Sequence, residues 1–379
     1  MRNAWALLLV SLLAQDATAQ SLRGYVGTFT PGPGEAASAN PAQSRLGEGI
    51  YLVDIDAATG ALGAHRLAAR SYSPTWIAID PARNLLFASN EYRGPDNSGT
   101  VSAFAMDRTS GALTLINTKP TRGQPAHMAI HSSGKFVLAA NHGGGSIAVL
   151  PVGQDGTLGD ATDVFQAPAG AGRSVSQVHF VTSDPSGRFV VANDAGTGKI
   201  LTLRLDPETG KLALAAVFDA AQGSTPRHGG FSPDGRTFYN LFERTSAVGV
   251  YDFDPRTGAM TERQMVSALP PDFAGRNTGG ELLVSRDGAR IYVTNRGHDT
   301  VATLGVDASG KVSLLGESPS QNDAPRSLAF DPTGRLLFAM NQAGGSVTSF
   351  RIDPATGVAH YAGHALAVNA PATMVVLAP

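Results

Sequence analysis

The sequence contains no cysteine among its 379 residues. Disulfide bonds, thiolate catalysis and zinc sites built on cysteine are therefore excluded. Charged residues are also scarce, at 16% of the chain, and the formal net charge of −2 comes without any run of lysine or arginine. Because proteins that bind nucleic acid need such positive charge to neutralise phosphates, the composition predicts no nucleic-acid partner.

Long hydrophobic segments are missing too, apart from one near the N-terminus. Arg2 gives a positive start, Ala4 to Ala14 form an apolar run, and Ala17-Thr18-Ala19 supply small residues suited to cleavage. The run is too short for a membrane-spanning helix, which needs about 20 residues. The pattern predicts a cleaved signal peptide over residues 1–19. We therefore expect an exported protein, periplasmic or secreted, without a membrane segment after cleavage.

Glycine and proline are abundant, at 44 and 23 residues, and many of the glycines recur at a regular spacing. An alternating strand followed by a polar turn with glycine, such as GIYLVDIDAATGAL at 49–62, occurs seven times. The turn glycines are Gly60, Gly111, Gly156, Gly210, Gly258, Gly310 and Gly357, with steps of 45 to 54 residues between them. A period of this length is typical of repeat folds such as propellers.

A second repeated unit alternates with the first and consists of a strand, a turn of the Asp/Ser-Pro-x-Gly kind and another strand. Complete copies occur at 77–90, 128–141, 180–194, 229–242, 282–295 and 328–341. A seventh copy is split between GYVGTF at 24–29 and MVVL at 374–377. The split predicts that the C-terminal strand completes a blade begun by the N-terminus, which closes a ring.

We therefore predict an all-β fold in which residues 20–379 form a single seven-bladed β-propeller with four-stranded antiparallel blades. A pair of sandwiches or a solenoid is the alternative, but neither explains the split copy.

The repeat also predicts which side chains lie together. Three positions of each repeat are relevant: the first two residues of the innermost strand and the last residue of the next strand. Because these strands are antiparallel, all three positions lie at one mouth of the central channel. Where apolar residues would be ordinary, these positions hold Glu91, His127, His142, His179, Arg227, His228, Glu243, Glu281, Arg296 and Arg326, and His298 follows shortly after Arg296. Charge concentrated at a channel mouth predicts a functional site.

Longer loops at 31–47, 168–177 and 269–279 lead to the same mouth. Arg173, Phe273 and Arg276 in these loops could cover a ligand. For residues 31–47, a solvated connection without a function is an equal alternative.

Several segments carry a recognisable pattern: YVGTF (25–29), SNE (89–91), QPAHMAIHSSGKFVLAANHGGGSIAV (124–149), PRHGGFSPDG (226–235), LPPDFAGRNTGGELLVSRDG (269–288) and TNRGHDTVA (294–302). In this combination, the chain from about Gly24 to its C-terminus resembles the seven-bladed propeller lactonase family. That family includes propeller-type 6-phosphogluconolactonases and fungal carboxy-muconate lactonising enzymes.

The resemblance implies a catalytic set of one histidine, one glutamate and two arginines, which carries over to His179, Arg227, Glu243 and Arg296. Gln177 is a departure, because the family often has a histidine there, two residues before the one that matches His179. The signal segment is a second departure, since a sugar-phosphate lactonase of the pentose phosphate route would be cytoplasmic.

Lactone hydrolysis requires an activated water, a stabilised oxyanion and a held substrate. Arg227 and Arg296 suit the last two tasks, since a guanidinium donates a planar fork of hydrogen bonds to an oxyanion or carboxylate. Glu243 or His179 could accept the proton of water, and histidine is favoured by its ordinary pKa of about 6.5. An ion pair of Arg227 and Glu243 that only stabilises one hairpin is the structural alternative.

Seven further residues are candidates for binding the substrate: Glu91, His127, His142, His228, Glu281, His298 and Arg326. For His127, His131 and His228, structural hydrogen bonding is favoured over catalysis. The Gly143-Gly144-Gly145 run lacks the Lys-Ser/Thr of a phosphate-binding P-loop, which favours a tight turn.

Two other functions stay open from the sequence: an intramolecular lyase of the muconate type, and a propeller that binds a ligand without catalysis. We expect a monomer whose partner is a small lactone, with no cofactor. We also expect no metal, although Glu91, Glu243 and Glu281 near one mouth leave room for one.

Overall fold

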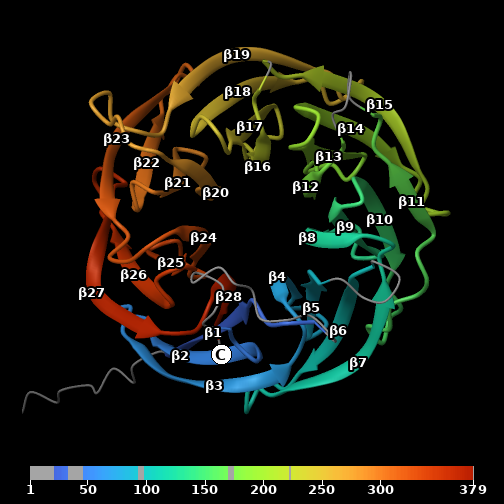
Figure 1. The fold of residues 1–379 in the computed structure, drawn as a ribbon, viewed down its shortest axis with the longest axis horizontal. Helices are drawn as coiled ribbons and strands as arrows, with labels where there is room; N and C mark the ends of the chain where they lie inside the picture. Colours follow the sequence, from blue (N-terminus) through green and yellow to red (C-terminus); the bar gives the residue numbers. More distant parts are fainter. Residues whose placement is uncertain (1–20, 33–45, 93–97, 170–174, 222, 379) are drawn as a thin grey trace, which may run out of the picture.

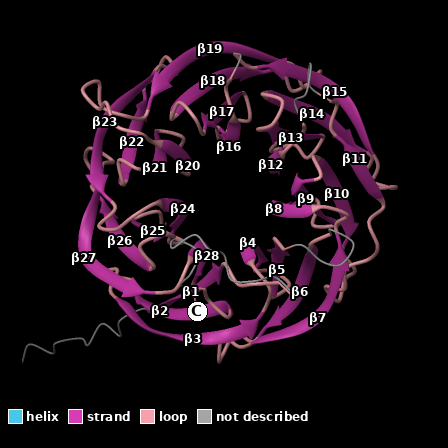
Figure 2. Cartoon of the chain, in the orientation of Figure 1, coloured by secondary structure: helices cyan, strands magenta, loops and turns pink. Residues whose placement is uncertain are grey.

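The computed structural model describes residues 21–32, 46–92, 98–169, 175–221 and 223–378, and every regular element in these ranges is a β-strand (Figure 2). The strands form seven sheets of four strands, which stand around a central axis as the blades of a propeller (Figure 1). The predicted all-β, seven-bladed architecture is confirmed. The predicted signal peptide and Arg173 lie outside the described residues.

The blades are numbered along the chain, and each is given from its innermost strand outward. Blade 1 contains β28 (Pro371–Leu377), β1 (Ser21–Thr28), β2 (Gly49–Asp56) and β3 (Leu62–Arg70). Blade 2 contains β4 (Pro74–Asp80), β5 (Leu85–Asn90), β6 (Thr100–Met106) and β7 (Leu113–Pro120). Blade 3 contains β8 (Gln124–Ile130), β9 (Phe136–Gly143), β10 (Ser146–Pro151) and β11 (Asp163–Gln166). Blade 4 contains β12 (Val178–Ser183), β13 (Phe189–Asp194), β14 (Lys199–Leu205) and β15 (Leu212–Asp219).

Blade 5 contains β16 (Pro226–Phe231), β17 (Thr237–Phe242), β18 (Ala247–Phe253) and β19 (Met260–Ser267). Blade 6 contains β20 (Thr278–Val284), β21 (Arg290–Arg296), β22 (Thr300–Val306) and β23 (Val312–Pro319). Blade 7 contains β24 (Pro325–Phe330), β25 (Leu336–Asn341), β26 (Ser346–Ile352) and β27 (Ala359–Ala367).

Blade 1 closes the ring with both ends of the chain. Strand β28 pairs antiparallel with β1, so that Val375 lies opposite Tyr25 and Met374 opposite Val26. The same strand contacts β24 and β4, the inner strands of the two neighbouring blades. The split repeat read from the sequence is therefore the point at which the propeller closes.

The hydrophobic core is divided among the contacts between blades. Seven clusters of buried side chains each join two adjacent blades; Phe189 and Phe253, for example, pack between blades 4 and 5 with ring centroids 5.9 Å apart. A second strand such as β5 is buried along its whole length, while an outer strand such as β15 has mostly exposed or half-buried residues. Since burial is supplied between the blades, the mouth of the channel is free to carry polar groups.

The seven turn glycines that reveal the repeat all have positive φ angles, between 68° and 84°. A residue with a Cβ atom is strained in this left-handed region, whereas glycine adopts it readily. In the first copy, the Gly60 amide donates a hydrogen bond to the carbonyl of Asp56 and closes the turn between β2 and β3. The period of the sequence is thus set by a backbone conformation that every blade repeats.

Candidate active site

Each inner strand has a break in its regular pairing close to the channel mouth. In blade 5, Pro226 lies opposite Phe242 and His228 lies opposite Leu241, so Arg227 has no residue across from it. From blade 1 to blade 7, the residues passed over in this way are Ala372, Thr75, Ala126, His179, Arg227, Gly280 with Glu281, and Arg326. Such a β-bulge turns a side chain out of the alternating pattern of the strand. The bulges therefore give the mouth seven equivalent positions.

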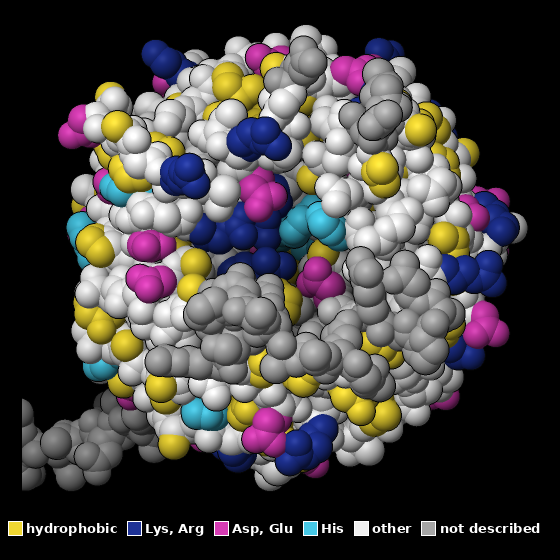
Figure 3. Space-filling view, viewed as in Figure 1, with side chains coloured by type: hydrophobic (Ala, Val, Ile, Leu, Met, Phe, Trp, Pro, Cys, Tyr) yellow, Lys and Arg dark blue, Asp and Glu magenta, His cyan; other side chains and the backbone are white. Residues whose placement is uncertain are grey.

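The centre of the ring is a charged hollow on this face. Figure 3 shows dark blue basic side chains gathered there, with acidic and histidine side chains beside them. The ion pairs among the described residues bring Arg227 and Arg296 to Glu243, and Arg326 to Glu91. Residues from blades 2, 5, 6 and 7 thus meet, as the register predicted.

Glu243, just after β17, lies between two arginines. Its Oε1 atom is 3.7 Å from Nε of Arg227 and accepts a hydrogen bond from Nη2 of Arg296. Burial on its own would raise the pKa of Glu243, but attraction to Arg227 and Arg296 outweighs burial and lowers that pKa. Glu243 is therefore a carboxylate at neutral pH.

The Arg227 side chain is almost completely buried, with a residue exposure of 1%. Its Nη1 atom donates a hydrogen bond to the carbonyl of Gly280, while Nε has no hydrogen-bond partner among the described residues. Burial, and then repulsion from Arg296 and Arg326, lowers the pKa of Arg227. A guanidinium nevertheless keeps its proton in proteins, so the mouth retains this buried positive charge.

Arg296 ends β21 and is held from the same side of the mouth. Its Nη2 atom donates a 2.8 Å hydrogen bond to the carbonyl of Gly279. The backbone of β20 therefore holds both guanidinium groups, Arg296 through Gly279 and Arg227 through Gly280.

His179 comes from the bulge of blade 4 and faces two other histidines. Its ring centroid is 5.4 Å from that of His142 and 5.2 Å from that of His228. Burial, assisted by the charge of Arg227, lowers the pKa of His179 well below its ordinary value, so the imidazole is neutral at neutral pH. Its Nδ1 atom is buried and has no hydrogen-bond partner among the described residues.

A second arginine–carboxylate pair lies across the mouth. Nη2 of Arg326 is 3.9 Å from Oε2 of Glu91, and the Thr75 hydroxyl donates a 2.8 Å hydrogen bond to that same oxygen. The guanidinium of Arg326 also stacks on Phe29, 5.0 Å from the ring centroid. Burial lowers the pKa of His142, and the negative charges of Glu91 and Glu243 partly oppose this effect.

Three of the other predicted residues lie one layer deeper. His127, His228 and Glu281 are all buried, and Trp76 packs its ring 4.2 Å from His127. Burial lowers the pKa of His127 to about 3, so this histidine is neutral. His228 Nδ1 lies 2.9 Å from Oε1 of Glu281.

His298 lies on the rim instead. Its Nδ1 atom is 3.3 Å from Oε2 of Glu317 and 3.1 Å from the hydroxyl of Thr300, and its ring packs 4.4 Å from that of Phe273. None of these contacts is to Arg296.

Sequence reasoning gave no role to the groups that hold the arginines. Thr75 and Phe29 fix Glu91 and Arg326, and the carbonyls of Gly279 and Gly280 fix Arg296 and Arg227. Thr75 occupies the same register position as Arg227, so the repeat contains a signal for it. A backbone carbonyl leaves no such signal in the sequence.

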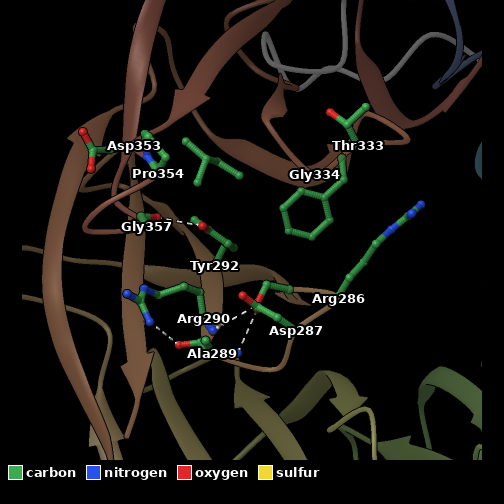
Figure 4. A pocket seen from close by; sticks show the side chains of 13 residues that line it. Arg286, Asp287, Ala289, Arg290, Tyr292, Thr333, Gly334, Asp353, Pro354 and Gly357 are labelled. Carbon is green, nitrogen blue, oxygen red and sulfur yellow. Dashed lines mark hydrogen bonds between the residues drawn. The ribbon is translucent and has the colours of Figure 1, made fainter.

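A separate hollow of about 340 Å³ lies between blades 6 and 7 (Figure 4). It is lined by the turns that follow β20 and β24, at the ends of those strands that are farther from the charged mouth. The hydroxyl of Tyr292 in its wall donates a 2.7 Å hydrogen bond to the carbonyl of Gly357. This hollow shares no residue with the charged mouth.

Among the described residues, no group of three histidine or acidic side chains is arranged to hold a metal ion, and no helix is long and apolar enough to cross a membrane.

Comparison with known proteins gives one consistent result. The profile of the family described as "Lactonase, 7-bladed beta-propeller" matches residues 23–376. A 6-phosphogluconolactonase of Bacillus subtilis is 33% identical over 340 residues, which cover 88% of this chain and 92% of that protein. The solved structure of a periplasmic gluconolactonase from Pseudomonas aeruginosa is 30% identical in sequence and superposes with a TM-score of 0.85, covering 95% of this chain and 100% of the other. The chain therefore belongs to the seven-bladed β-propeller lactonase family.

Proposed function

We propose that the protein hydrolyses a sugar lactone or a related lactone at the charged mouth of the propeller. The observation that carries the proposal is the meeting of Arg227, Arg296 and Glu243 beside a neutral histidine, His179, in a member of a lactonase family. Two fixed guanidinium groups next to a neutral base suit attack on an ester carbonyl, in which negative charge develops on one oxygen.

In the proposed reaction, water adds to the lactone carbonyl and the bond between the carbonyl carbon and the ring oxygen breaks. His179 accepts the proton of the attacking water, since its imidazole is neutral and its Nδ1 atom is unpartnered among the described residues. Arg227 and Arg296 stabilise the oxyanion. The proton then passes to the departing ring oxygen, and the product is a hydroxy acid.

Glu243 serves in this scheme to hold the two arginines rather than to accept the proton. Its Oε1 atom is already engaged by both guanidinium groups, whereas Nδ1 of His179 has no hydrogen-bond partner among the described residues. Across the mouth, Glu91, Arg326 and His142 are positioned to bind the hydroxyl groups of a sugar lactone.

Purified protein assayed with glucono-δ-lactone in a pH-stat tests the proposal. We expect acid release well above the spontaneous rate, and a loss of about 100-fold or more in kcat for Glu243→Gln because both arginines lose the negative charge that lies between them. Glu262→Gln removes an exposed carboxylate from the outer strand of the same blade and should leave the rate unchanged. A wild-type protein that accelerates hydrolysis of no lactone would refute the proposal.

Export is part of the proposal. It is supported by the signal-like pattern of residues 1–19 and by the periplasmic relative from Pseudomonas aeruginosa. Mass measurement of the protein from a periplasmic or culture fraction should give a mature chain that begins at Gln20. We also expect a monomer by light scattering. An intact Met1 in a cytoplasmic fraction would contradict export without affecting the activity.

A further inference from the structure

Glu281 is a deeply buried acid near the mouth, with a residue exposure of 2%. It sits in the bulge of β20, where Gly280 and Glu281 together face Thr294, whose hydroxyl oxygen accepts a 2.7 Å hydrogen bond from the Glu281 amide. The bulge aims the two residues at different partners on β16. Gly280 offers its carbonyl to Arg227, and the carboxyl of Glu281 meets His228.

The surroundings of the carboxyl group suit a neutral acid better than an anion. Oε1 lies 2.9 Å from His228 Nδ1, while the buried Oε2 has no hydrogen-bond partner among the described residues. A buried carboxylate with one unpartnered oxygen is costly, whereas the protonated acid needs fewer partners.

Neighbouring charges only partly offset the cost of burial. Arg227 on β16, the backbone amide of Leu282 and Arg326 on β24 favour the carboxylate, but burial outweighs them and raises the pKa of Glu281 to about 8. The ring of His228 is no competing proton acceptor, because burial and then the charges of Arg227, Arg326 and Arg296, with His127 nearby, hold its pKa well below the ordinary value.

We infer that Glu281 is a positioning residue that remains a neutral acid, donates a hydrogen bond to Nδ1 of His228 and thereby keeps the proton of that ring on Nε2. The inference rests on the proposed lactonase activity for its kinetic consequence. While Glu281 is neutral, only Glu243 offsets the positive charge of Arg227, which can then stabilise the oxyanion. An ionised Glu281 would also offset that positive charge and would move the ring proton of His228 to Nδ1.

Two substitutions separate the neutral donor from a carboxylate. Glu281→Gln keeps a donor that can reach Nδ1 but cannot ionise, and we expect its kcat/KM at pH 7 to stay within about threefold of wild type. Glu281→Leu has a similar volume and is also neutral, but it has no donor to fix the ring of His228, which packs 5.2 Å from that of His179. It should therefore lower kcat/KM by about tenfold or more with little change in KM. Glu262→Gln on the exposed outer strand is the charge control. Equal losses in the Gln and Leu variants would overturn the inference.

The dependence on pH gives a second arm. Because lactones hydrolyse spontaneously in alkali, it is measured as binding of a lactam analogue, which does not hydrolyse. With a pKa of about 8 for Glu281, only about a tenth of the protein keeps the proton at pH 9, so wild-type affinity should fall several-fold between pH 7 and pH 9. Glu281→Gln should show no such fall, and parallel curves for the two proteins would contradict the inference.

A spectroscopic arm is independent of catalysis. In protein labelled with ¹⁵N-histidine, the His228 signal is identified by its loss in His228→Gln, and long-range ¹H–¹⁵N spectra report which ring nitrogen is protonated. We expect an unprotonated Nδ1 at pH 7 in wild type and in Glu281→Gln; a protonated Nδ1 in wild type would overturn the inference. If wild type hydrolysed no lactone, the proposed function would fail while this spectrum still decided the state of Glu281. The wild-type spectrum also tests the inference in the case that the Glu281→Leu variant does not fold.

Discussion

Two arcs of the mouth share one backbone and differ in their side chains. The bulge positions of blades 1 to 3 hold Ala372, Thr75 and Ala126, and we call them the uncharged arc. Those of blades 4, 5 and 7 hold His179, Arg227 and Arg326, and we call them the charged arc. Because every blade repeats the bulge, the fold offers seven nearly equivalent places for a side chain. At these positions the charged and histidine side chains are confined to one arc by the choice of residue and not by a change of fold, while blades 2 and 3 contribute Glu91 and His142 from the ends of their second strands. This agrees with the general rule that function resides in sites placed on a scaffold.

The largest effect is expected from removing the central side chain of the charged arc. Arg227→Ala should lower kcat/KM for a lactone by about 1,000-fold, because one fixed donor to an oxyanion contributes about 3–4 kcal/mol. Steady-state kinetics measure the loss. Arg236→Ala removes an exposed arginine from the turn at the other end of the same β16–β17 hairpin and should have no effect. Similar activity in the two variants would mean that the charged arc is structural.

Much of this contrast could be predicted from the sequence. The period of the turn glycines and the split repeat determine seven closed blades, and the register places Arg227, Glu243 and Arg296 at one mouth. The reason is physical: positive φ requires glycine, and antiparallel pairing relates positions on adjacent strands.

What could not be predicted depends on contacts between blades. The sequence shows a histidine at 228 and a glutamate at 281, but not that they pair across blades 5 and 6 at 2.9 Å. Nor does it show that the carbonyls of Gly279 and Gly280 anchor two arginines, since a backbone carbonyl is present at every residue.

A second substitution tests the glycine that separates Arg227 from Arg326 around the ring. A Cβ atom on Gly280 would lie 2.8 Å from the carbonyl oxygens of both Pro325 and Arg326, so space for alanine is lacking. Gly280→Ala should lower the free energy of unfolding by about 1–3 kcal/mol and should lower kcat as well, because the acceptor of Arg227 moves.

The matched change in the uncharged arc is Ala126→Gly, at the bulge of blade 3. It should cost up to about 1 kcal/mol of stability through backbone entropy and should leave kcat unchanged. Urea denaturation and initial rates measure both variants. Equal kcat in Gly280→Ala and wild type would show that the Gly280 carbonyl does not position Arg227.

Arg326 tests whether the charged arc has two roles. Its partner is Glu91 and not Glu243, so Arg326→Ala should raise KM by about tenfold while kcat changes little, as expected for loss of uniform binding. Arg335→Ala, an exposed arginine in the turn at the far end of the β24–β25 hairpin, is the control. A loss in kcat with unchanged KM would place Arg326 with Arg227 among the groups that stabilise the transition state.

The smallest effect concerns His127, directly after the bulge of blade 3, and shows that the uncharged arc is not inert. Burial lowers the pKa of His127 from its ordinary value of 6.5 to about 3. Below pH 6.5, His127 therefore binds a proton in the unfolded chain but not in the folded protein. Stability is therefore complete above pH 6.5 and falls as the pH decreases toward the folded pKa. For this one histidine, the loss in the free energy of unfolding between pH 6.5 and pH 5.5 is about 1 kcal/mol.

Urea denaturation of wild type and His127→Gln at both pH values measures this effect. Between pH 6.5 and pH 5.5, the free energy of unfolding of wild type should fall by about 1 kcal/mol more than that of His127→Gln. An unchanged pH slope would mean that His127 takes up its proton in the folded state, and the layer beneath the uncharged arc would then carry positive charge as well.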